Sequence, residues 1–317
     1  MFSMDFKIQI GKFRLMLIDK VEITKSVEQL ADTAVVTLPG TVFNRTLDIE
    51  SKISEGDEIT IEFGYNGDLK PEFAGYVESI STDDNTIKIN CEDEIFKYRK
   101  SLKNTEFKNV SVKQILQHIN KEIGGFDLNC DYDFQYEKFT IYNADAFDVL
   151  KKIQEETKSN VYLKGKTLHI HPQYSQIGNK VIYDFAVNIE KSDLKYKDVK
   201  KRKVLVEVEG KKVSGEVVKE TVGVTGGDKI NIKMDGVSDR ATLKRIAENQ
   251  LAIKSYTGYE GSITGWLIPY CEPTDKAEIR DKDYEIKNGD YYVVSVQTSF
   301  SESGGSRKIG IGKKISK

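Results

Sequence analysis

The sequence contains few cysteines, which can cross-link a chain, and few prolines, which restrict its backbone. It holds three cysteines, Cys91, Cys130 and Cys271, which lie far apart and form no Cys-x-x-Cys pair. A disulfide scaffold and a cysteine zinc site are therefore not expected, and the thiols fit reduced, partly buried side chains of a protein made in the cytoplasm. Only five of the 317 residues are proline and charge is spread evenly, which argues against a long disordered tail.

Long apolar runs and an excess of one charge are missing as well. No run of about 18 apolar residues occurs, so no membrane insertion is expected. Residues 1–10 alternate apolar and polar residues and lack the apolar core of a secretory signal. The 48 basic and 50 acidic residues give a net charge of −2, whereas a protein dedicated to binding duplex nucleic acid is usually clearly basic.

The first hundred residues instead show the pattern of short β-strands. Apolar and polar residues alternate in residues 6–10, 21–24, 33–38, 58–63, 72–80 and 86–91. Asn66-Gly67 is a strong turn signal, because both residues tolerate a positive φ. Strands of this length and spacing predict a small antiparallel barrel or sandwich.

The middle of the chain changes to a helical period. Ser111, with Gln114 three residues later, forms a predicted capping box for a helix that Gly124-Gly125 ends. A second helix is expected after Asn143, followed by a hairpin of residues 160–163 and 167–171. These elements predict a compact α+β segment.

The last third returns to strands around one long helix. Residues 203–209 and 213–221 are expected to pair, a helix is expected at about 239–256 with Ser238 as its cap, and strands resume from 261 to 312. We therefore predict an α+β, β-rich fold in which two similar small antiparallel β-barrels flank an inserted α/β module. The predicted domains are residues 1–97, 98–185 and 186–317, the last containing the long helix.

Two strand segments share a sequence pattern. Tyr76–Thr82 and Tyr292–Thr298 both read Tyr-Val-x-Ser-[Ile/Val]-x-Thr, and each is followed by a polar turn and a final strand. Coincidence is one explanation, since these residue types are common in strands. The other is a duplicated barrel, which predicts equivalent environments for Tyr76 and Tyr292.

Short catalytic and metal-binding motifs do not support an active site. Gly165-Lys166-Thr167 resembles the end of a phosphate loop, but Asn160 stands where the first glycine is needed and the segment lies in a hairpin. His169 and His171 share one side of a strand, yet an ordinary strand face fits them better than a metal site without a third ligand. Ser192 and Lys195 match a weak Ser-x-x-Lys pattern in a charged stretch. We predict no enzyme activity and no catalytic, cofactor-binding or metal-binding residue.

Charged residues leave two further interpretations open. Asp83-Asp84 and the pair Asp281 and Asp283 fit turns, where aspartate bonds the local backbone. The basic run from Lys195 to Lys203 could contact nucleic-acid phosphates, with Tyr196 stacking, but acidic neighbours favour a solvated strand entry.

Three segments together resemble a known family. Residues 56–65 with 73–77 (GDEITIEFGY and FAGYV) resemble its barrel hairpin, residues 145–153 with 160–170 resemble its helix-plus-hairpin module, and residues 289–296 with 300–301 and 304–307 resemble the closing strands of a second barrel. The resemblance is to baseplate hub proteins of contractile-tailed bacteriophages, including the late control D group, and to the hub-like part of type VI secretion spike proteins.

This resemblance implies a structural role in the tail baseplate of a virion or phage-like machine. It implies a homotrimer that presents six similar barrels to a hexameric tail tube protein on one side and a trimeric spike protein on the other. DNA would pass through its lumen without sequence recognition.

Two other functions stay open at this point. A secreted or surface carbohydrate-binding β protein is one, with Trp266 and several tyrosines as a sugar platform. A tail-associated cell-wall hydrolase is the other, which would need two carboxylates across a cleft.

Overall fold

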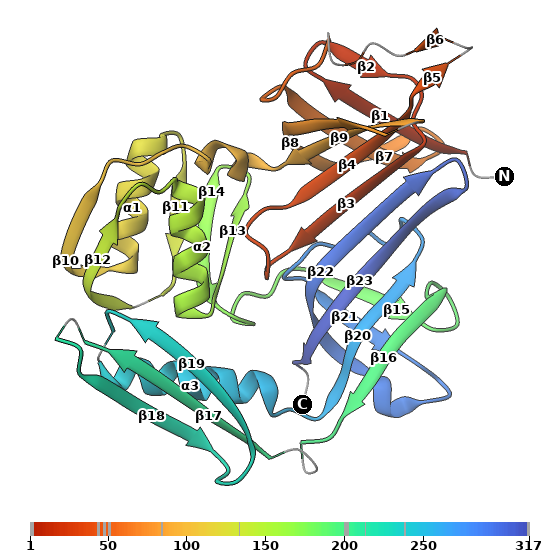
Figure 1. Ribbon diagram of the computed structural model, residues 1–317. Helices are drawn as coiled ribbons and strands as arrows, with labels where there is room; N and C mark the ends of the chain where they lie inside the picture. Colours follow the sequence, from red (N-terminus) through yellow and green to blue (C-terminus); the bar gives the residue numbers. More distant parts are fainter. Residues whose placement is uncertain are drawn as a thin grey trace.

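The structure is a computed structural model that describes residues 3–42, 45–46, 49, 52–83, 85–132, 134–199, 203–212, 214–237 and 239–315. Strands dominate it, and the described residues form three α-helices (Figure 1). The predicted α+β, β-rich class is confirmed. No helix among the described residues is long and apolar enough to cross a membrane.

Two groups of strands, one from each end of the chain, make up most of the β structure. The N-terminal repeat consists of β1 (Met4–Ile10), β2 (Phe13–Leu15), β3 (Lys20–Ser26), β4 (Thr33–Pro39), β7 (Glu58–Tyr65), β8 (Asp68–Thr82) and β9 (Thr86–Glu92). The short pair β5 (Thr41–Val42) and β6 (Arg45–Thr46) lies beside it. The C-terminal repeat consists of β15 (Lys180–Asp184), β16 (Lys191–Lys197), β20 (Gly258–Gly265), β21 (Lys276–Arg280), β22 (Gly289–Ser301) and β23 (Gly304–Lys314), with the 3-10 turn η2 (Glu285–Lys287).

The two repeats have the same strand order. The first runs β3-β4-β9-β8-β7-β1 across the sheet and the second runs β16-β20-β23-β22-β21-β15, with corresponding strands in the same order along the chain. One difference is that β1 pairs with β7 in an antiparallel fashion, whereas β15 pairs with β21 in parallel. A duplication therefore explains the shared sequence pattern better than coincidence does.

The hydrogen-bond register repeats as well. Val77 pairs with Cys91, and after a bulge Ser79 pairs with Asn90. In the C-terminal repeat Val293 pairs with Ile311, and after the same bulge Ser295 pairs with Gly310. A bulge bends a strand at a defined place, so each long strand, β8 or β22, turns at the same point of its repeat.

Tyr76 and Tyr292 occupy the same register position, opposite Glu58 and Lys276 respectively. Their surroundings differ, however. Tyr292 is fully buried and its ring lies 4.8 Å from that of Tyr174. Tyr76 is half-buried and stacks on Phe96 at 5.6 Å. The predicted equivalence is confirmed for the backbone position and is wrong for the side-chain packing, which depends on what each neighbouring unit supplies.

The repeats are joined in one sheet of 13 strands. Its main path among the described residues is open, from β16 at one end to β2 at the other, and β22 pairs with β3 where the repeats meet. Where the sequence predicted two small antiparallel β-barrels, the strand order gives two curved halves of one shared sheet. The physical reason is that β3 uses its outer edge for β22 of the other repeat.

The unit between the repeats has the predicted helices and hairpin. It consists of η1 (Glu94–Tyr98), β10 (Thr105–Ser111), α1 (Val112–Ile123), β11 (Asp127–Cys130), β12 (Gln135–Ile141), α2 (Ala146–Thr157), β13 (Ser159–Lys164) and β14 (Thr167–Pro172). The capping box of Ser111 and Gln114 is present at the start of α1, and Asp145 caps α2 by accepting a bond from the Asp148 amide. Gly165 turns the β13–β14 hairpin with a φ of 58°.

A second helical unit interrupts the C-terminal repeat between β16 and β20. It consists of β17 (Val204–Lys211), β18 (Val217–Gly223), β19 (Asp228–Asp235) and α3 (Arg240–Lys254). Strand β17 pairs with β18 as predicted. The expected cap Ser238 and the strand start Val213 lie outside the described residues, and Asp239 accepts the capping bond from the Thr242 amide.

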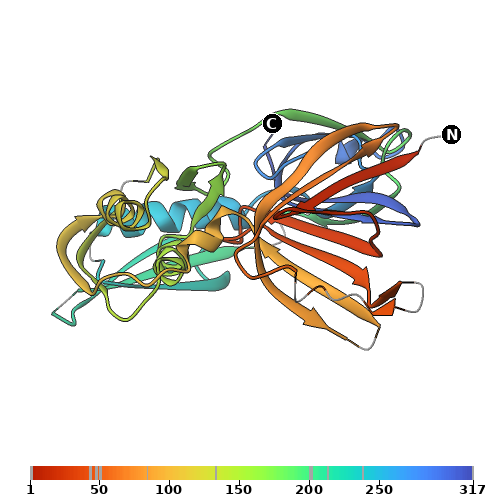
Figure 2. The same ribbon diagram turned by 90° about the horizontal axis from the view of Figure 1, so that it is seen from above.

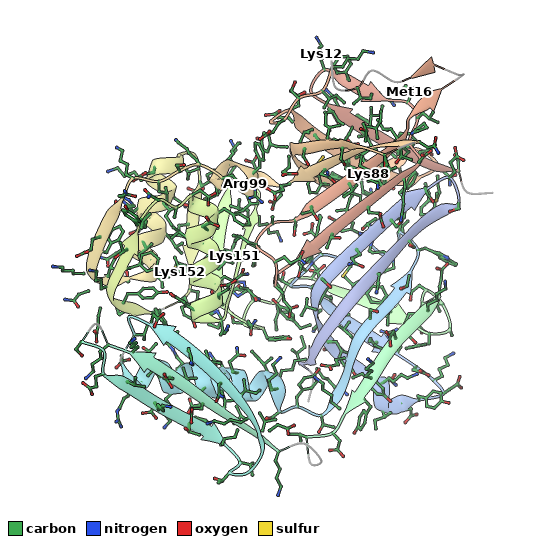
Figure 3. All side chains as sticks on the ribbon, in the orientation of Figure 1. Lys12, Met16, Lys88, Arg99, Lys151 and Lys152 are labelled. Carbon is green, nitrogen blue, oxygen red and sulfur yellow. The ribbon has the colours of Figure 1, made fainter. Side chains whose placement is uncertain are left out.

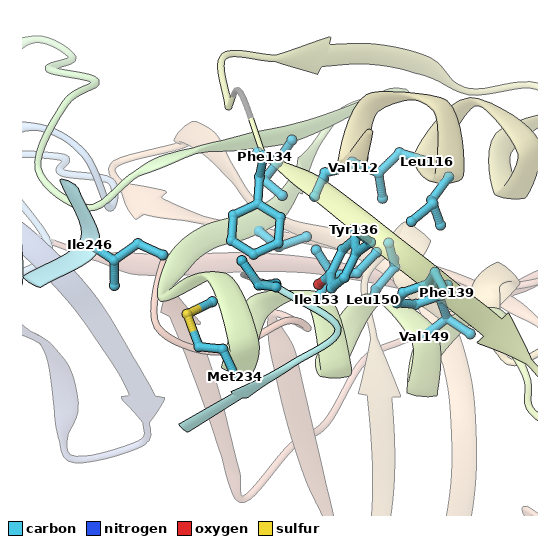
Figure 4. Packing of buried hydrophobic residues seen from close by; sticks show 14 of the residues in the cluster. Val112, Leu116, Phe134, Tyr136, Phe139, Val149, Leu150, Ile153, Met234 and Ile246 are labelled. Atoms are coloured by element: carbon cyan, nitrogen blue, oxygen red, sulfur yellow. The ribbon is translucent and has the colours of Figure 1, made fainter. Parts of the chain in front are cut away.

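The second helical unit packs on the middle unit, although its sequence is inserted in the C-terminal repeat. Ile246 of α3 and Met234 of β19 belong to one apolar core with Phe134, Tyr136 and Ile153 of the middle unit (Figure 4). The helix predicted inside residues 186–317 is therefore present, but it lies on its own three-stranded sheet. Strand β15, placed in the range 98–185 by the sequence, pairs with β21 of the C-terminal repeat. The domain bounds themselves stay a prediction.

The elements fall into two zones. Figures 1 and 2 show the helical units together on one side of the molecule and the joined sheet on the other. In the N-terminal repeat, the short turn between β3 and β4 occupies the place at which the C-terminal repeat carries the inserted unit. Leu30 of that turn reaches the apolar core of the helical zone.

The shared core of the helical zone generates a stability prediction. Ile246 is 2% exposed, so Ile246→Ala should lower the free energy of unfolding by about 2–5 kcal/mol. Ile286→Ala is the matched control, because Ile286 is 57% exposed. Urea unfolding followed by circular dichroism measures both. Equal effects of the two substitutions would contradict the packing described above.

Candidate functional site

The residues singled out for chemistry do not assemble into a catalytic centre. His169 and His171 do share one side of β14, where Tyr162 stacks on the first ring at 5.2 Å and contacts the second edge-on at 5.4 Å. Burial lowers the pKa of both imidazoles. No group of three or more histidine, cysteine, aspartate or glutamate side chains in the described ranges could hold a metal ion. The two rings form an aromatic cluster with Tyr162.

The other sequence candidates have structural positions. Asp281 is buried, bonds Lys287 at 2.6 Å and accepts the amide of Asp283, as expected of an aspartate in a turn. Asp83 bonds Lys88 at 2.5 Å in the turn before β9, and Asp84 lies outside the described residues. Ser192 and Lys195 lie on β16, whereas residues 200–202 of the basic run are outside the described residues.

The two repeats meet at a junction formed by extensive backbone pairing between β22 and β3. Seven consecutive residues, Ser295 to Ser301 of β22, pair in antiparallel register with Ser26 to Lys20 of β3. In this register Val296, Thr298 and Phe300 of β22 lie on the same face of the sheet as Ile23 and Val21 of β3. Because a shift by one residue would invert every side chain, this register aligns the apolar faces of both repeats.

A buried ion pair fastens the junction from the apolar side. The guanidinium of Arg307 donates to both carboxylate oxygens of Glu72, at 2.6 and 3.1 Å, and to the Thr298 hydroxyl at 2.9 Å. Its Nε donates to the Leu267 carbonyl at 3.2 Å. Arg307 is 2% exposed and Glu72 is 3% exposed. Arg307 comes from β23 and Glu72 from β8, so this pair links the two repeats.

Apolar side chains cross the junction in the same direction. Leu267, from the loop between β20 and β21, belongs to the apolar core of the N-terminal repeat. Phe300 of β22 enters that core too, and its ring stacks on that of Phe63 with centroids 4.4 Å apart. The N-terminal repeat therefore completes its core with side chains of the C-terminal repeat.

Beside the junction lies a crevice of about 450 Å³ where both repeats meet the β13–β14 hairpin. Its charged lining residues are Lys25, Asp32, Asp93, Glu94, Lys164, Lys166 and Glu272. Burial raises the pKa of Asp32 to about 6, opposed by the charge of Lys25. Burial and the neighbouring Asp32 also raise the pKa of Asp93. Each carboxyl accepts a backbone amide, from Ser26 and Ile95 respectively, and the Asp93 amide bonds the Asp32 carbonyl at 3.0 Å. The pair thus ties local turns together.

The opposite face of the joined sheet is polar across both repeats. Alternate residues of its strands point to that side and are mostly serine, threonine, asparagine, glutamine or charged. They include Glu22, Thr24, Thr37, Ser79, Ser81, Lys88 and Asn90 in the N-terminal repeat, and Asp193, Lys195, Ser262, Thr264, Ser295, Gln297 and Lys308 in the C-terminal repeat. Figure 3 marks Lys88 on this sheet and Lys12 and Met16 at the far tip of the N-terminal repeat. Both charges occur on this face, as suits a surface without strong preference for one ligand.

Sequence reasoning missed the junction. The pattern Tyr-Val-x-Ser identified the duplicated strands, but it carries no information on which edges meet. Two signals were present: Arg307 on an otherwise apolar strand face, and the length of β22, which continues beyond β21. An arginine among core residues needs a buried partner, and this requirement alone does not select Glu72 among 50 acidic residues.

The buried ion pair generates a second prediction. Glu72→Gln should lower the free energy of unfolding by about 3–5 kcal/mol, because it leaves the Arg307 charge buried without a counterion. The control Asp68→Asn removes an exposed ion pair to Lys70 and should cost less than about 1 kcal/mol. In the double variant Glu72→Gln, Arg307→Met the loss should be smaller than for Glu72→Gln alone. Chemical denaturation measures the free energy of unfolding of all three variants. A Glu72→Gln variant as stable as the Asp68→Asn control would show that the Glu72–Arg307 pair does not stabilise the fold.

The carboxyls in the crevice generate a pH prediction. A carboxyl whose folded pKa is about 6, above its unfolded value of about 3.9, binds more protons in the folded chain. The contribution of Asp32 to stability is therefore largest below pH 4 and declines as pH rises to about 6. Asp32→Asn should make the thermal midpoint depend less on pH between pH 4 and 7 and should raise that midpoint at pH 7. Asp68→Asn should leave the pH dependence of the midpoint unchanged. An unaltered profile in Asp32→Asn would refute the raised pKa.

Comparisons with known proteins agree on the fold. No protein-family model matches the sequence, and no curated protein matches it. Among solved structures, the 43 kDa tail protein of prophage MuSo2 from Shewanella oneidensis superposes with a TM-score of 0.70 at 17% identity, covering 97% of this chain and 98% of that protein. A tail protein from Neisseria meningitidis gives 0.69 at 14% identity over 98% of this chain and 97% of the other.

A third structure extends the likeness to secretion machines. The Escherichia coli c3393 protein, described as a component of the type VI secretion system, gives a TM-score of 0.61 at 11% identity, covering 98% of this chain and 79% of that protein. Identities this low show a common fold only. The chain therefore has, over nearly its whole length, the fold of phage tail proteins and of a type VI secretion component, in agreement with the resemblance found in the sequence.

Proposed function

We propose that this protein is a structural baseplate hub, of the late control D type, in a phage tail or phage-like contractile injection machine. The observation that carries the proposal is the whole-chain likeness to tail proteins combined with the duplicated repeat. Fold alone does not fix function, and the duplication supplies an independent geometric argument.

The duplication suits a protein that adapts one symmetry to another. A homotrimer of a chain with two equivalent repeats carries six similar half-sheets around one axis. Such a ring would present a nearly six-fold surface to a hexameric tail tube protein and a three-fold surface to a trimeric spike protein. A closed ring covers sheet edges between neighbouring copies and leaves no open heterologous face for further copies.

The polar face of the sheet fits the wall of a channel in this ring. It carries serine, threonine and mixed charges, so DNA or another cargo would pass without a strong electrostatic trap. This agrees with the net charge of −2. The work is mechanical, since the hub seals, positions and transmits, and we assign no catalytic residue.

The hydrolase alternative gains nothing from Asp32 and Asp93, whose pKa values are raised. Both carboxyls accept backbone amides of adjacent turns, a structural use that differs from the acid and base roles of glycoside hydrolysis. For the carbohydrate-binding alternative, Trp266 is 54% exposed, but its neighbour Leu267 is the side chain that fixes this loop to the other repeat.

Solution mass tests the proposal. Size-exclusion chromatography with light scattering, from low to high micromolar concentration, should show a species of about three times 35.9 kDa, and electron microscopy should show a ring with a central opening. A chain that stays monomeric at every concentration, and also in the presence of tube and spike proteins, would contradict the hub assignment.

A further inference from the structure

Among the unpaired edges that the described part of the joined sheet offers, two belong to corresponding places of the repeat junction. Strand β16, at the end of the sheet, pairs only with β20. The second half of β8, Ser79 to Thr82, pairs with β9 on one side only, because β7 reaches no further than Tyr76. Exposed edges are sites for pairing with another chain unless they are blocked. Neither edge carries a proline.

The duplicated repeat shows what these edges correspond to. By register, β16 is the counterpart of β3, and Ser79–Thr82 is the counterpart of Ser295–Thr298 in β22. Backbone bonds next to the bulge repeat too: the Val77 amide bonds the Asp57 carbonyl, and the Val293 amide bonds the Asp275 carbonyl, both at 2.9 Å. Within the chain, the counterparts β22 and β3 pair with each other.

We propose that β16 of one copy pairs with Ser79–Thr82 of β8 of a second copy, repeating between chains the junction that β3 and β22 form within the chain. The inference rests on the proposed ring and adds the surface and register by which its copies meet. The partner is a second copy of this chain, because β16 is the counterpart of β3 and Ser79–Thr82 is the counterpart of the β22 segment that pairs with β3.

The intramolecular register predicts the pairs between chains. Carrying the β22–β3 pairs over to the counterparts places Ser79 opposite Lys197, Ile80 opposite Tyr196, Ser81 opposite Lys195 and Thr82 opposite Leu194. Ile80 and Leu194 are partly buried against the cores of their own repeats, so this register continues the apolar face. Tyr196 is 46% exposed in the single chain and would be covered by a cross-strand contact with Ile80.

The junction between chains lacks the clamp of the junction within the chain. The register counterpart of Arg307 is Ile87, since these residues pair with Thr298 and Thr82 respectively. The counterpart of Glu72 is Asn288, because Phe73 and Gly289, the residues that follow them, occupy corresponding positions in the two repeats. No buried ion pair can form from these residues. We therefore expect association between copies to depend on concentration, whereas the internal junction is permanent.

Cysteine cross-linking tests the register with four substitutions, combined in four double variants. Directly opposed residues in antiparallel strands have Cα atoms about 4.5–5.5 Å apart, within reach of a disulfide, whereas diagonal neighbours lie about 7–8 Å apart and are too distant. The in-register variants are Ser81→Cys with Lys195→Cys, and Ser79→Cys with Lys197→Cys. The matched controls are Ser79→Cys with Lys195→Cys, and Ser81→Cys with Lys197→Cys.

The expected result is a covalent trimer from both in-register variants after mild oxidation, read on a non-reducing gel, with at least tenfold less from both controls. Any such bond joins two chains, since six strands separate β16 from β8 within one chain. The native cysteines are buried or half-buried, and the wild-type chain measures their background. Reduced variants should keep the wild-type thermal midpoint.

The outcomes separate this inference from the proposed function. A trimer by light scattering with equal cross-linking in all four variants, or with none, would overturn the strand pairing and leave the hub assignment standing. A monomer at high micromolar concentration without cross-links would count against both. Preferential cross-linking in the control variants would show pairing of these edges in another register and overturn the register derived above.

Discussion

Antiparallel pairing of β22 with β3 is the constraint on which the rest of the structure depends. It turns two copies of one strand pattern into a single sheet with a continuous apolar face and a continuous polar face. It also leaves the C-terminal repeat with Leu267 and Phe300 inside the core of its neighbour. Neither repeat is therefore a complete module, and the relative placement of the two is fixed by backbone hydrogen bonds.

The helical zone gains its position from the same junction. The inserted unit leaves the C-terminal repeat between β16 and β20, at the place where the N-terminal repeat has the short β3–β4 turn, and it packs on the middle unit. The crevice with Asp32 and Asp93 lies where the repeats and the hairpin of the middle unit meet. Polar groups there are buried because three units converge, and their raised pKa values follow from that burial.

The sequence predicted local structure well and long-range pairing poorly. The helix capped by Ser111, the hairpin turned by Gly165 and the repeated Tyr-Val-x-Ser strands were predicted because caps, turns and strand alternation depend on neighbouring residues. The β22–β3 junction, the Glu72–Arg307 pair and the docking of α3 on the middle unit were not. Each depends on residues more than 80 positions apart, and many register choices satisfy the same alternation. The family resemblance supplied the fold, and the duplicated register gave it a physical basis.

A three-dimensional reconstruction of the oligomer by electron cryomicroscopy tests the central claim most directly, because it shows which edges meet. The account predicts a ring of three chains in which six similar half-sheets form one continuous wall, with β16 of each chain beside β8 of the next and the polar face towards the axis. A ring held by the helical units, with β16 and the end of β8 open to solvent, would contradict it.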